Sequence, residues 1–125
     1  MPKYVDGFVL PIATKNLAAY RRLARLTARV WREHGALEYR ECVGEDLKIK
    51  DVLSFPTLAK SRPGETVVLA WIVFKSRAHR DRVNKLVLAD PRLKKVMASG
   101  KMPFDCKRMA YGGFEVLVDG ARGQR

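Results

Sequence analysis

The chain has 125 residues, of which 47% are hydrophobic, and its 25 Lys and Arg outweigh its 13 Asp and Glu to leave a formal net charge of +12. This length suits one domain, and the hydrophobic content is sufficient for a packed core, which excludes a disordered chain. Two cysteines exclude a disulfide scaffold and a four-cysteine zinc module. No apolar run approaches the ~20 residues of a membrane-spanning helix. We expect one domain over residues 1–119 and a flexible tail over 120–125.

The N-terminal segment indicates the compartment. Its apolar stretch, residues 7–13, is short and is interrupted by Pro11, whereas a secretion signal needs a longer apolar core and a cleavage site of small residues. We therefore expect a cytoplasmic protein in which Cys42 and Cys106 are reduced thiols.

The positive charge is concentrated in two segments. Residues 15–34 and 76–95 together carry ten of the twelve net charges. A basic surface attracts nucleic acid or an anionic membrane, but it also keeps a protein soluble. We favour the second interpretation, because charge without a recognition motif is weak support for a partner.

The first half of the chain predicts a helix between two strands. Residues 4–11 mix aromatic and β-branched side chains and predict a strand. Apolar side chains then recur at steps of three and four up to Gly35, with arginines on a separate stripe, which predicts an amphipathic helix that ends at this glycine. Residues 36–43 predict a second strand, and residues 44–63, which are polar and hold two prolines, predict a long excursion.

The second half predicts strand, helix and strand. Residues 66–74 are nearly all apolar, as in a central strand buried on both faces. Ser76 is expected to cap a helix that breaks at Asp90, and the following Pro91 is expected to begin a short helix to Ala98. Residues 107–118 predict the last strand.

The order of strand, helix, strand, strand, helix, strand predicts an α+β fold. Right-handed crossovers turn this order into a ferredoxin-like four-stranded antiparallel sheet with both helices on one face. We expect the other face to carry apolar residues, including part of the set Tyr4, Asp6, Phe8, Leu10 and Trp71. Such a face is too apolar to remain exposed to solvent. We therefore expect a homodimer with facing sheets, a dimeric α/β barrel.

Several sequence strings carry a family resemblance. They include YVDGFVLP (4–11), VWREHGALEY (30–39), WIVFKSRAHRD (71–81) and DPRL (90–93). These strings resemble the YbaA-like family of uncharacterised bacterial proteins, which carries a domain of unknown function, and the resemblance extends over residues 4–119. The family is similar in fold to the dimeric α/β-barrel superfamily, which includes small quinone-type monooxygenases, haem enzymes and stress-induced proteins. The resemblance implies the fold and the dimer, and it implies no reaction.

Polar residues on the predicted strands form the candidate ligand-binding set. A carboxylate on an inner strand needs a partner, because an unpaired buried charge is costly. We expect Asp6 to pair with Arg108, which opens the last strand. The candidate set, which would orient a small, partly aromatic ligand in a cavity, is Asp6, Tyr39, Glu41, Trp71 and Arg108. The alternative is a salt-bridge network at the dimer interface that binds nothing.

The remaining chemistry-bearing residues favour structural roles. His34 is expected to cap the end of its helix rather than to act as a base or a haem ligand. His79, among arginines, is expected on the surface. We predict no metal and no cofactor, because no CxxC, HxH or HExxH spacing is present. Neither Cys42 nor Cys106 is expected to be a nucleophile.

Three functional hypotheses follow. The leading one is a small-molecule-binding homodimer, with a cofactor-free monooxygenase-like or isomerase-like reaction left open. The alternative is a basic, non-catalytic module for nucleic acid or an acidic partner, which predicts salt-sensitive binding that involves Arg25 and Arg29. No RNP-like string supports nucleic acid, and no membrane partner is expected. A purely structural role is the third hypothesis.

Overall fold

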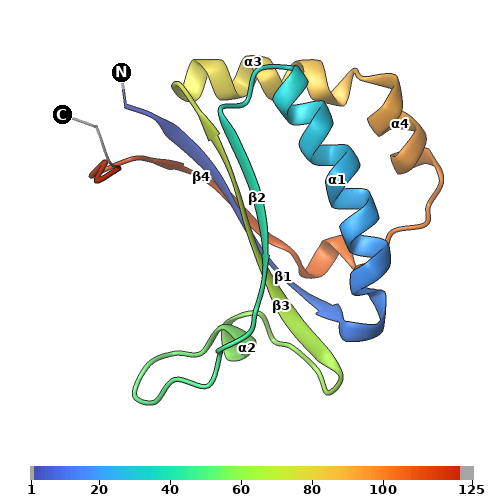
Figure 1. Ribbon diagram of the computed structural model, residues 1–125, viewed down its shortest axis with the longest axis vertical. Helices are drawn as coiled ribbons and strands as arrows, with labels where there is room; N and C mark the ends of the chain where they lie inside the picture. The colour runs from blue at the N-terminus through green and yellow to red at the C-terminus, as the bar shows by residue number, and fades with distance from the viewer. Residues whose placement is uncertain (1, 122–125) are drawn as a thin grey trace.

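The computed structural model describes residues 2–121, and Figure 1 shows its arrangement. The elements in chain order are β1 (Tyr4–Ala13), η1 (Thr14–Asn16), α1 (Leu17–Glu33), β2 (Glu38–Val43), α2 (Phe55–Leu58), β3 (Glu65–Phe74), α3 (Arg77–Leu88), α4 (Pro91–Ala98), η2 (Cys106–Arg108) and β4 (Ala110–Glu115).

The four strands form one antiparallel sheet. Their order is β2-β3-β1-β4, so the two central strands are β1 and β3 and the two edges are β2 and β4. This is the ferredoxin-like order that the element sequence predicts. The sheet of one chain is open, and no strand joins its two edges within residues 2–121. The α+β prediction is therefore confirmed, while a closed barrel is not formed by one chain.

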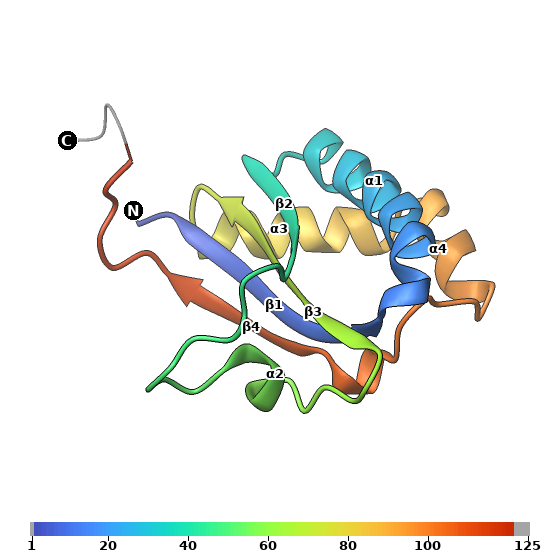
Figure 2. The ribbon, with the colours of Figure 1, turned by 60° about the horizontal axis from the view of Figure 1, so that its bottom comes forward.

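The main helices cover one face of the sheet. In Figures 1 and 2, α1, α3 and α4 lie together on one side, and the opposite face has no such layer. We call these the helix face and the open face. The core lies between the helices and the sheet and is lined by Leu10, Ile12, Val30, Val68, Ile72, Phe74, Val83 and Val87, each with at most 2% of its surface exposed.

The register of β1 and β3 determines which of the expected residues lie on the open face. Phe8 pairs with Ala70, and Gly7 pairs with Trp71. Side chains alternate between faces along a strand, so Trp71 shares the open face with Gly7, while Tyr4, Asp6, Phe8 and Leu10 share the helix face with the buried residues of β3. The open face was expected to carry part of this five-residue set, and Trp71 is the member that lies on it. A sequence alone does not fix how two strands pair, so the division of the set was not predictable.

Helix α1 follows the predicted pattern. Its buried residues Tyr20, Ala24 and Val30 recur along one stripe and pack onto the sheet. The helix ends at Glu33, with His34 as its C-cap, and Gly35 adopts a φ of +119°, a backbone conformation that residues other than glycine rarely adopt. The predicted helix end is confirmed.

The 44–63 excursion contains a short helix that the sequence did not predict. Ser54 caps α2 by accepting a hydrogen bond from the backbone N–H of Thr57 (3.2 Å). Figures 1 and 2 place this excursion on the side of the sheet away from the helices, beside the lower end of β3. Several of its large apolar side chains are exposed, and they are Ile49, Val52, Leu53, Phe55 and Leu58.

The C-terminal third has two sharply defined helix starts and a shortened last strand. Ser76 caps α3 and Pro91 opens α4, as predicted. Asp90, which was expected only to break the preceding helix, also caps α4. The last strand covers 110–115 rather than 107–118, because η2 intervenes before it. Of the predicted tail, residues 122–125 lie outside the described residues.

Candidate functional site

Glu41 on β2 is held by two tyrosines. Tyr20 on α1 donates a 2.6 Å hydrogen bond to Oε1 of Glu41, and Tyr39 donates a 2.6 Å hydrogen bond to Oε2. The hydroxyls of Tyr39 and Thr27 lie 2.7 Å apart. Tyr39 and Glu41 face the same way because they are two residues apart on one strand. The pairing of these two predicted site residues is the closest contact within the predicted set.

Two cavities meet at this cluster. An outer cavity of about 280 Å³ lies between α1 and the edge strand β2. An inner cavity of about 240 Å³ lies between the helices and the sheet. Four residues line both cavities, and they are Tyr20, Ala24, Tyr39 and Glu41. The Glu41 cluster therefore lies at the boundary that the two spaces share.

The lining of the inner cavity is largely apolar. Its aromatic residues are Phe8, Tyr20, Trp31, Tyr39 and Phe104, and its methionines are Met97, Met102 and Met109. Aromatic and thioether side chains pack well against flat, polarisable molecules. Glu41 is the one carboxylate in this lining.

The environment of the cluster keeps both tyrosines protonated. Burial raises the pKa of Tyr20 far above its ordinary value of 10.0, and the charge of Glu41 raises it further. Burial and Glu41 raise the pKa of Tyr39 in the same way. Both hydroxyls are therefore protonated at neutral pH and can donate to Glu41.

A second carboxylate, Asp6 on β1, lies between the sheet and α3. It is 1% exposed, and its Oδ1 lies 3.3 Å from Nε of Arg80. Asn84 donates a 3.2 Å hydrogen bond to Oδ2. The guanidinium of Arg80 also lies over the ring of Tyr4, 4.9 Å from its centre, and donates to its hydroxyl.

Asp6 is connected to the inner cavity through one chain of hydrogen bonds. Trp31, which lines that cavity, donates to Asn84 (3.0 Å), and Asn84 donates to Asp6. Oδ1 of Asp6 and Nε of Arg80 are buried and make no hydrogen bond. Burial raises the pKa of Asp6, and the hydrogen bond from Asn84 and the charge of Arg80 only partly offset this effect.

The predicted pair of Asp6 with Arg108 is wrong. Arg108 lies in η2 rather than at the start of the last strand, and it forms two hydrogen bonds with Glu65, at 2.7 and 2.8 Å. This bidentate pair is the main cause that lowers the pKa of Glu65 to about 2. Asp6 takes its cation from α3 instead, because Arg80 covers the helix face that Asp6 occupies.

Trp71 lies apart from both carboxylates. It is on the open face, where its indole N–H donates a 3.2 Å hydrogen bond to Glu38. The structure therefore brings Tyr39 and Glu41 together and leaves Asp6, Trp71 and Arg108 at three other places.

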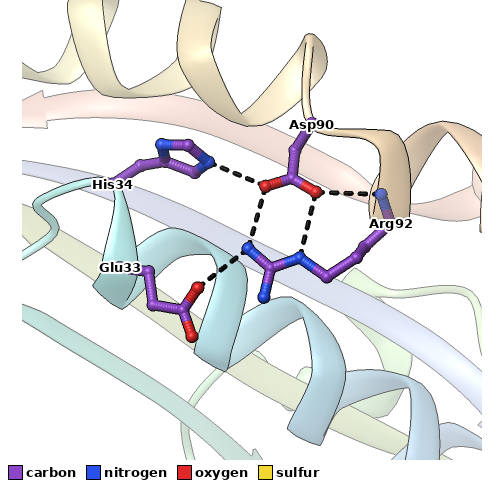
Figure 3. Close-up of polar contacts among 4 residues, drawn as sticks. All are labelled: Glu33, His34, Asp90 and Arg92. Carbon is purple, nitrogen blue, oxygen red and sulfur yellow. Dashed lines mark hydrogen bonds and ion pairs between the residues drawn. The ribbon is translucent and has the colours of Figure 1, made fainter.

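A third carboxylate, Asp90, joins the end of α1 to the start of α4 (Figure 3). Nε2 of His34 lies 2.8 Å from Oδ2 of Asp90, and Arg92 contacts both carboxylate oxygens. Arg92 also pairs with Glu33 at 2.9 Å. The hydrogen bonds from Arg92 and then from His34 lower the pKa of Asp90. None of these four residues lines either cavity. The cluster therefore has a structural role, in which it links the end of α1 to the start of α4.

The other histidine, His79, is buried, whereas the sequence predicted it on the surface. His79 is 8% exposed, accepts a 3.0 Å hydrogen bond from the backbone N–H of Lys75 and packs edge-on against Phe74. Burial lowers its pKa. Within the described part of the chain, no group of three or more His, Cys, Asp or Glu side chains is arranged to hold a metal ion.

The sequence analysis missed several residues of these clusters. The spacing of Tyr20 and Thr27 places both on the apolar stripe of the first helix, and no further role was predicted for them, although a hydroxyl on such a stripe signals a buried partner. Arg80 was counted only among the basic residues of 76–95, and Asn84 was not singled out at all. Their position beside Asp6 depends on how α3 rotates over the sheet, which the periodicity of that helix does not define.

Comparison with known proteins identifies the family. Residues 3–106 match the family described as protein of unknown function DUF1428, and this match covers most of the chain. The chain belongs to the DUF1428 family. It is 42% identical over 117 residues to "Uncharacterized protein YbaA" of Escherichia coli (strain K12), with 94% of this chain and 98% of that protein aligned, and equally similar to the protein of that name from Shigella flexneri. The resemblance drawn from the sequence strings is confirmed.

One solved structure shares the fold. The crystal structure of a dimeric ferredoxin-like protein from an uncultured marine organism matches with a TM-score of 0.65 at 10% identity and covers 95% of this chain and 99% of its own. This similarity supports the ferredoxin-like fold. Within residues 2–121, no helix has the length and apolar character that crossing a membrane requires.

Proposed function

We propose that this protein is a homodimer that binds a small, partly aromatic molecule in the inner cavity. The observation that carries the proposal is the position of Glu41, whose carboxylate is held by two tyrosines in a largely apolar lining. Ligand sites typically combine an apolar cavity with a few fixed polar groups. The aromatic and methionine side chains would contact the body of the ligand.

Glu41 would orient the ligand by accepting a hydrogen bond. Its two oxygens already accept one bond each, from Tyr20 and Tyr39, and a carboxylate has further lone pairs available. A hydroxyl or amine of a ligand would be a suitable donor. The two tyrosines would keep the carboxylate in one orientation, which lowers the entropy lost on binding.

The open face supports the dimer. It exposes apolar side chains along β3 and β4, including Leu69 (39% exposed) and Phe114 (62%), beside the half-buried Trp71. Leu117 and Val118, just after β4, are almost fully exposed. Exposed large apolar side chains on an uncovered sheet face are typical of an interface. The solved neighbour of the same fold is itself described as dimeric.

A calorimetric titration tests the binding proposal. The probe is 1-phenyl-2-propanol, an aromatic ring with one hydroxyl, and propylbenzene is the same molecule without the hydroxyl. We expect the alcohol to bind more tightly, and Glu41→Gln to reduce this preference. Val96→Phe, which narrows the inner cavity, should weaken both probes. Leu86→Phe, on an exposed part of α3, is the matched control.

Two outcomes would contradict the proposal. One is that neither probe binds a correctly folded protein. The other is that Val96→Phe and Leu86→Phe bind the alcohol equally well, because the probe would then lie outside the cavity. Light scattering tests the dimer in the same samples, and it should report twice the 14.2 kDa mass of one chain.

A further inference from the structure

Two arginines at the outer cavity have no acidic partner in the described structure. Arg21 and Arg25 are one helical turn apart on α1, are exposed, and line the outer cavity. Neither forms an ion pair with any residue of the 2–121 range. The arginines that do pair with carboxylates are Arg40, Arg77, Arg80, Arg92 and Arg108.

These guanidinium groups share a cavity with Glu41. The outer cavity is bounded by α1 on one side, with Arg21 and Arg25, and by β2 on the other, with Glu41. Glu41 also lines the inner cavity, so this carboxylate is common to the space that holds the aromatic side chains and the space that holds the two arginines. A guanidinium is always charged and matches the planar geometry of a carboxylate.

We propose that the ligand is a small aromatic hydroxy acid. Its ring occupies the inner cavity, its hydroxyl donates to Glu41, and its carboxylate meets Arg21 and Arg25 in the outer cavity. This inference rests on the binding function proposed above and adds the chemical class of the ligand.

The charges of the site favour a ligand that carries both a hydroxyl and a carboxylate. A carboxylate alone next to Glu41 would be repelled, but a neighbouring hydroxyl offers Glu41 a donor while the acid group turns to the arginines. A neutral alcohol would satisfy Glu41 and leave both guanidinium groups to water. The combination of one acceptor and two cations is therefore complementary to a hydroxy acid.

A set of four probes separates the two polar contributions. Propylbenzene carries neither group, 1-phenyl-2-propanol carries the hydroxyl, 3-phenylpropionate carries the carboxylate and 3-phenyllactate carries both. We expect 3-phenyllactate to bind most tightly. Its advantage over 1-phenyl-2-propanol should decrease as salt is added, because exposed charges are screened.

Variants assign the carboxylate to its partners. Arg21→Gln and Arg25→Gln should each weaken 3-phenyllactate by about threefold, as expected for one exposed ion pair, and leave 1-phenyl-2-propanol unchanged. Arg29→Gln lies on the same helix, is exposed and does not line the outer cavity, so it serves as the matched control. All three positions are exposed, so the variants should fold normally.

The outcomes distinguish the hydroxy-acid inference from the binding function on which it rests. If 1-phenyl-2-propanol binds in the cavity but 3-phenyllactate binds no more tightly, the hydroxy-acid inference is wrong and the binding function stands. The inference also fails if the double variant Arg21→Gln/Arg25→Gln keeps the full advantage of the acid. If Val96→Phe leaves 3-phenyllactate binding unchanged, the acid binds outside the inner cavity. Both the hydroxy-acid inference and the proposed binding function are then wrong for this compound.

Discussion

The hydroxyl of Tyr20 on α1 donates a 2.6 Å hydrogen bond to Glu41 on β2, and this bond joins the helix layer to an edge strand of the sheet. Glu41 is thereby held at the boundary between the two cavities. The same contact links two layers of the fold and fixes the position of Glu41, the one carboxylate that lines the inner cavity among residues 2–121.

The Tyr20–Glu41 contact should be measurable as a coupling energy. Tyr20→Phe removes one donor from a carboxylate, and a hydrogen bond to a charged group contributes about 1.5–3 kcal/mol. In a double-mutant cycle with Glu41→Gln, we expect a coupling of about 1 kcal/mol or more in the free energy of unfolding. Urea denaturation of the four proteins measures it. Purely additive effects would show that the bond makes no contribution of its own.

The raised pKa values of Tyr20 and Tyr39 predict a loss of stability at alkaline pH. An unfolded tyrosine ionises near its ordinary pKa of 10.0, whereas burial keeps these two protonated in the folded chain. The unfolded state therefore releases protons first, so the contribution of these two tyrosines to the free energy of unfolding should be constant below about pH 10 and should fall above it. Denaturation between pH 8 and 11 tests this. The variant Tyr20→Phe/Tyr39→Phe should show a shallower fall, and an equal slope would argue against the assignment.

Loss of Arg80 should lower the free energy of unfolding by leaving Asp6 unpaired, whereas loss of Arg108 should have no effect through Asp6. Arg80→Leu leaves Asp6 buried without a cation, and breaking such a buried pair typically costs about 3–5 kcal/mol. Adding Asp6→Asn should recover part of this loss, because no buried charge then remains. Arg108→Gln is the control, since its partner is Glu65 and its effect should be independent of Asp6→Asn. Coupling of Arg108 to Asp6 in chemical denaturation would overturn the observed pairing.

The open face should be the dimer interface. Leu69→Glu introduces a charge at the centre of this face, and we expect sedimentation to report a monomer at concentrations where the parent chain is a dimer. Leu86→Glu, at a similarly exposed leucine of α3, should stay dimeric. A dimer that survives Leu69→Glu and dissociates with Leu86→Glu would move the interface to the helix layer.

The fold was accessible from the sequence because its signals are local. The arginine and apolar stripes of α1, the glycine at its end and the break at Asp90–Pro91 each depend on neighbouring residues. Strand pairing is not local, and a shift by one residue changes which face a side chain occupies. This is why Trp71 was grouped with Asp6 and Phe8, although it points away from them.

The candidate site was predictable only where two residues share an element. Tyr39 and Glu41 alternate on one strand, so their common face follows from their spacing. Asp6 required a partner for a sound physical reason, yet the choice between Arg80 and Arg108 depends on the rotation of α3 and on η2. No periodicity in the sequence reports either of these.

Mapping of backbone amide shifts by NMR during titration with 1-phenyl-2-propanol tests the central claim most directly. We predict that the largest saturable shifts occur at Ala24, Ala70 and Leu93, which line the inner cavity on three different elements. Shifts confined to the open face, around Leu69 and Phe114, or no saturable shifts at all, would contradict a ligand site in this cavity.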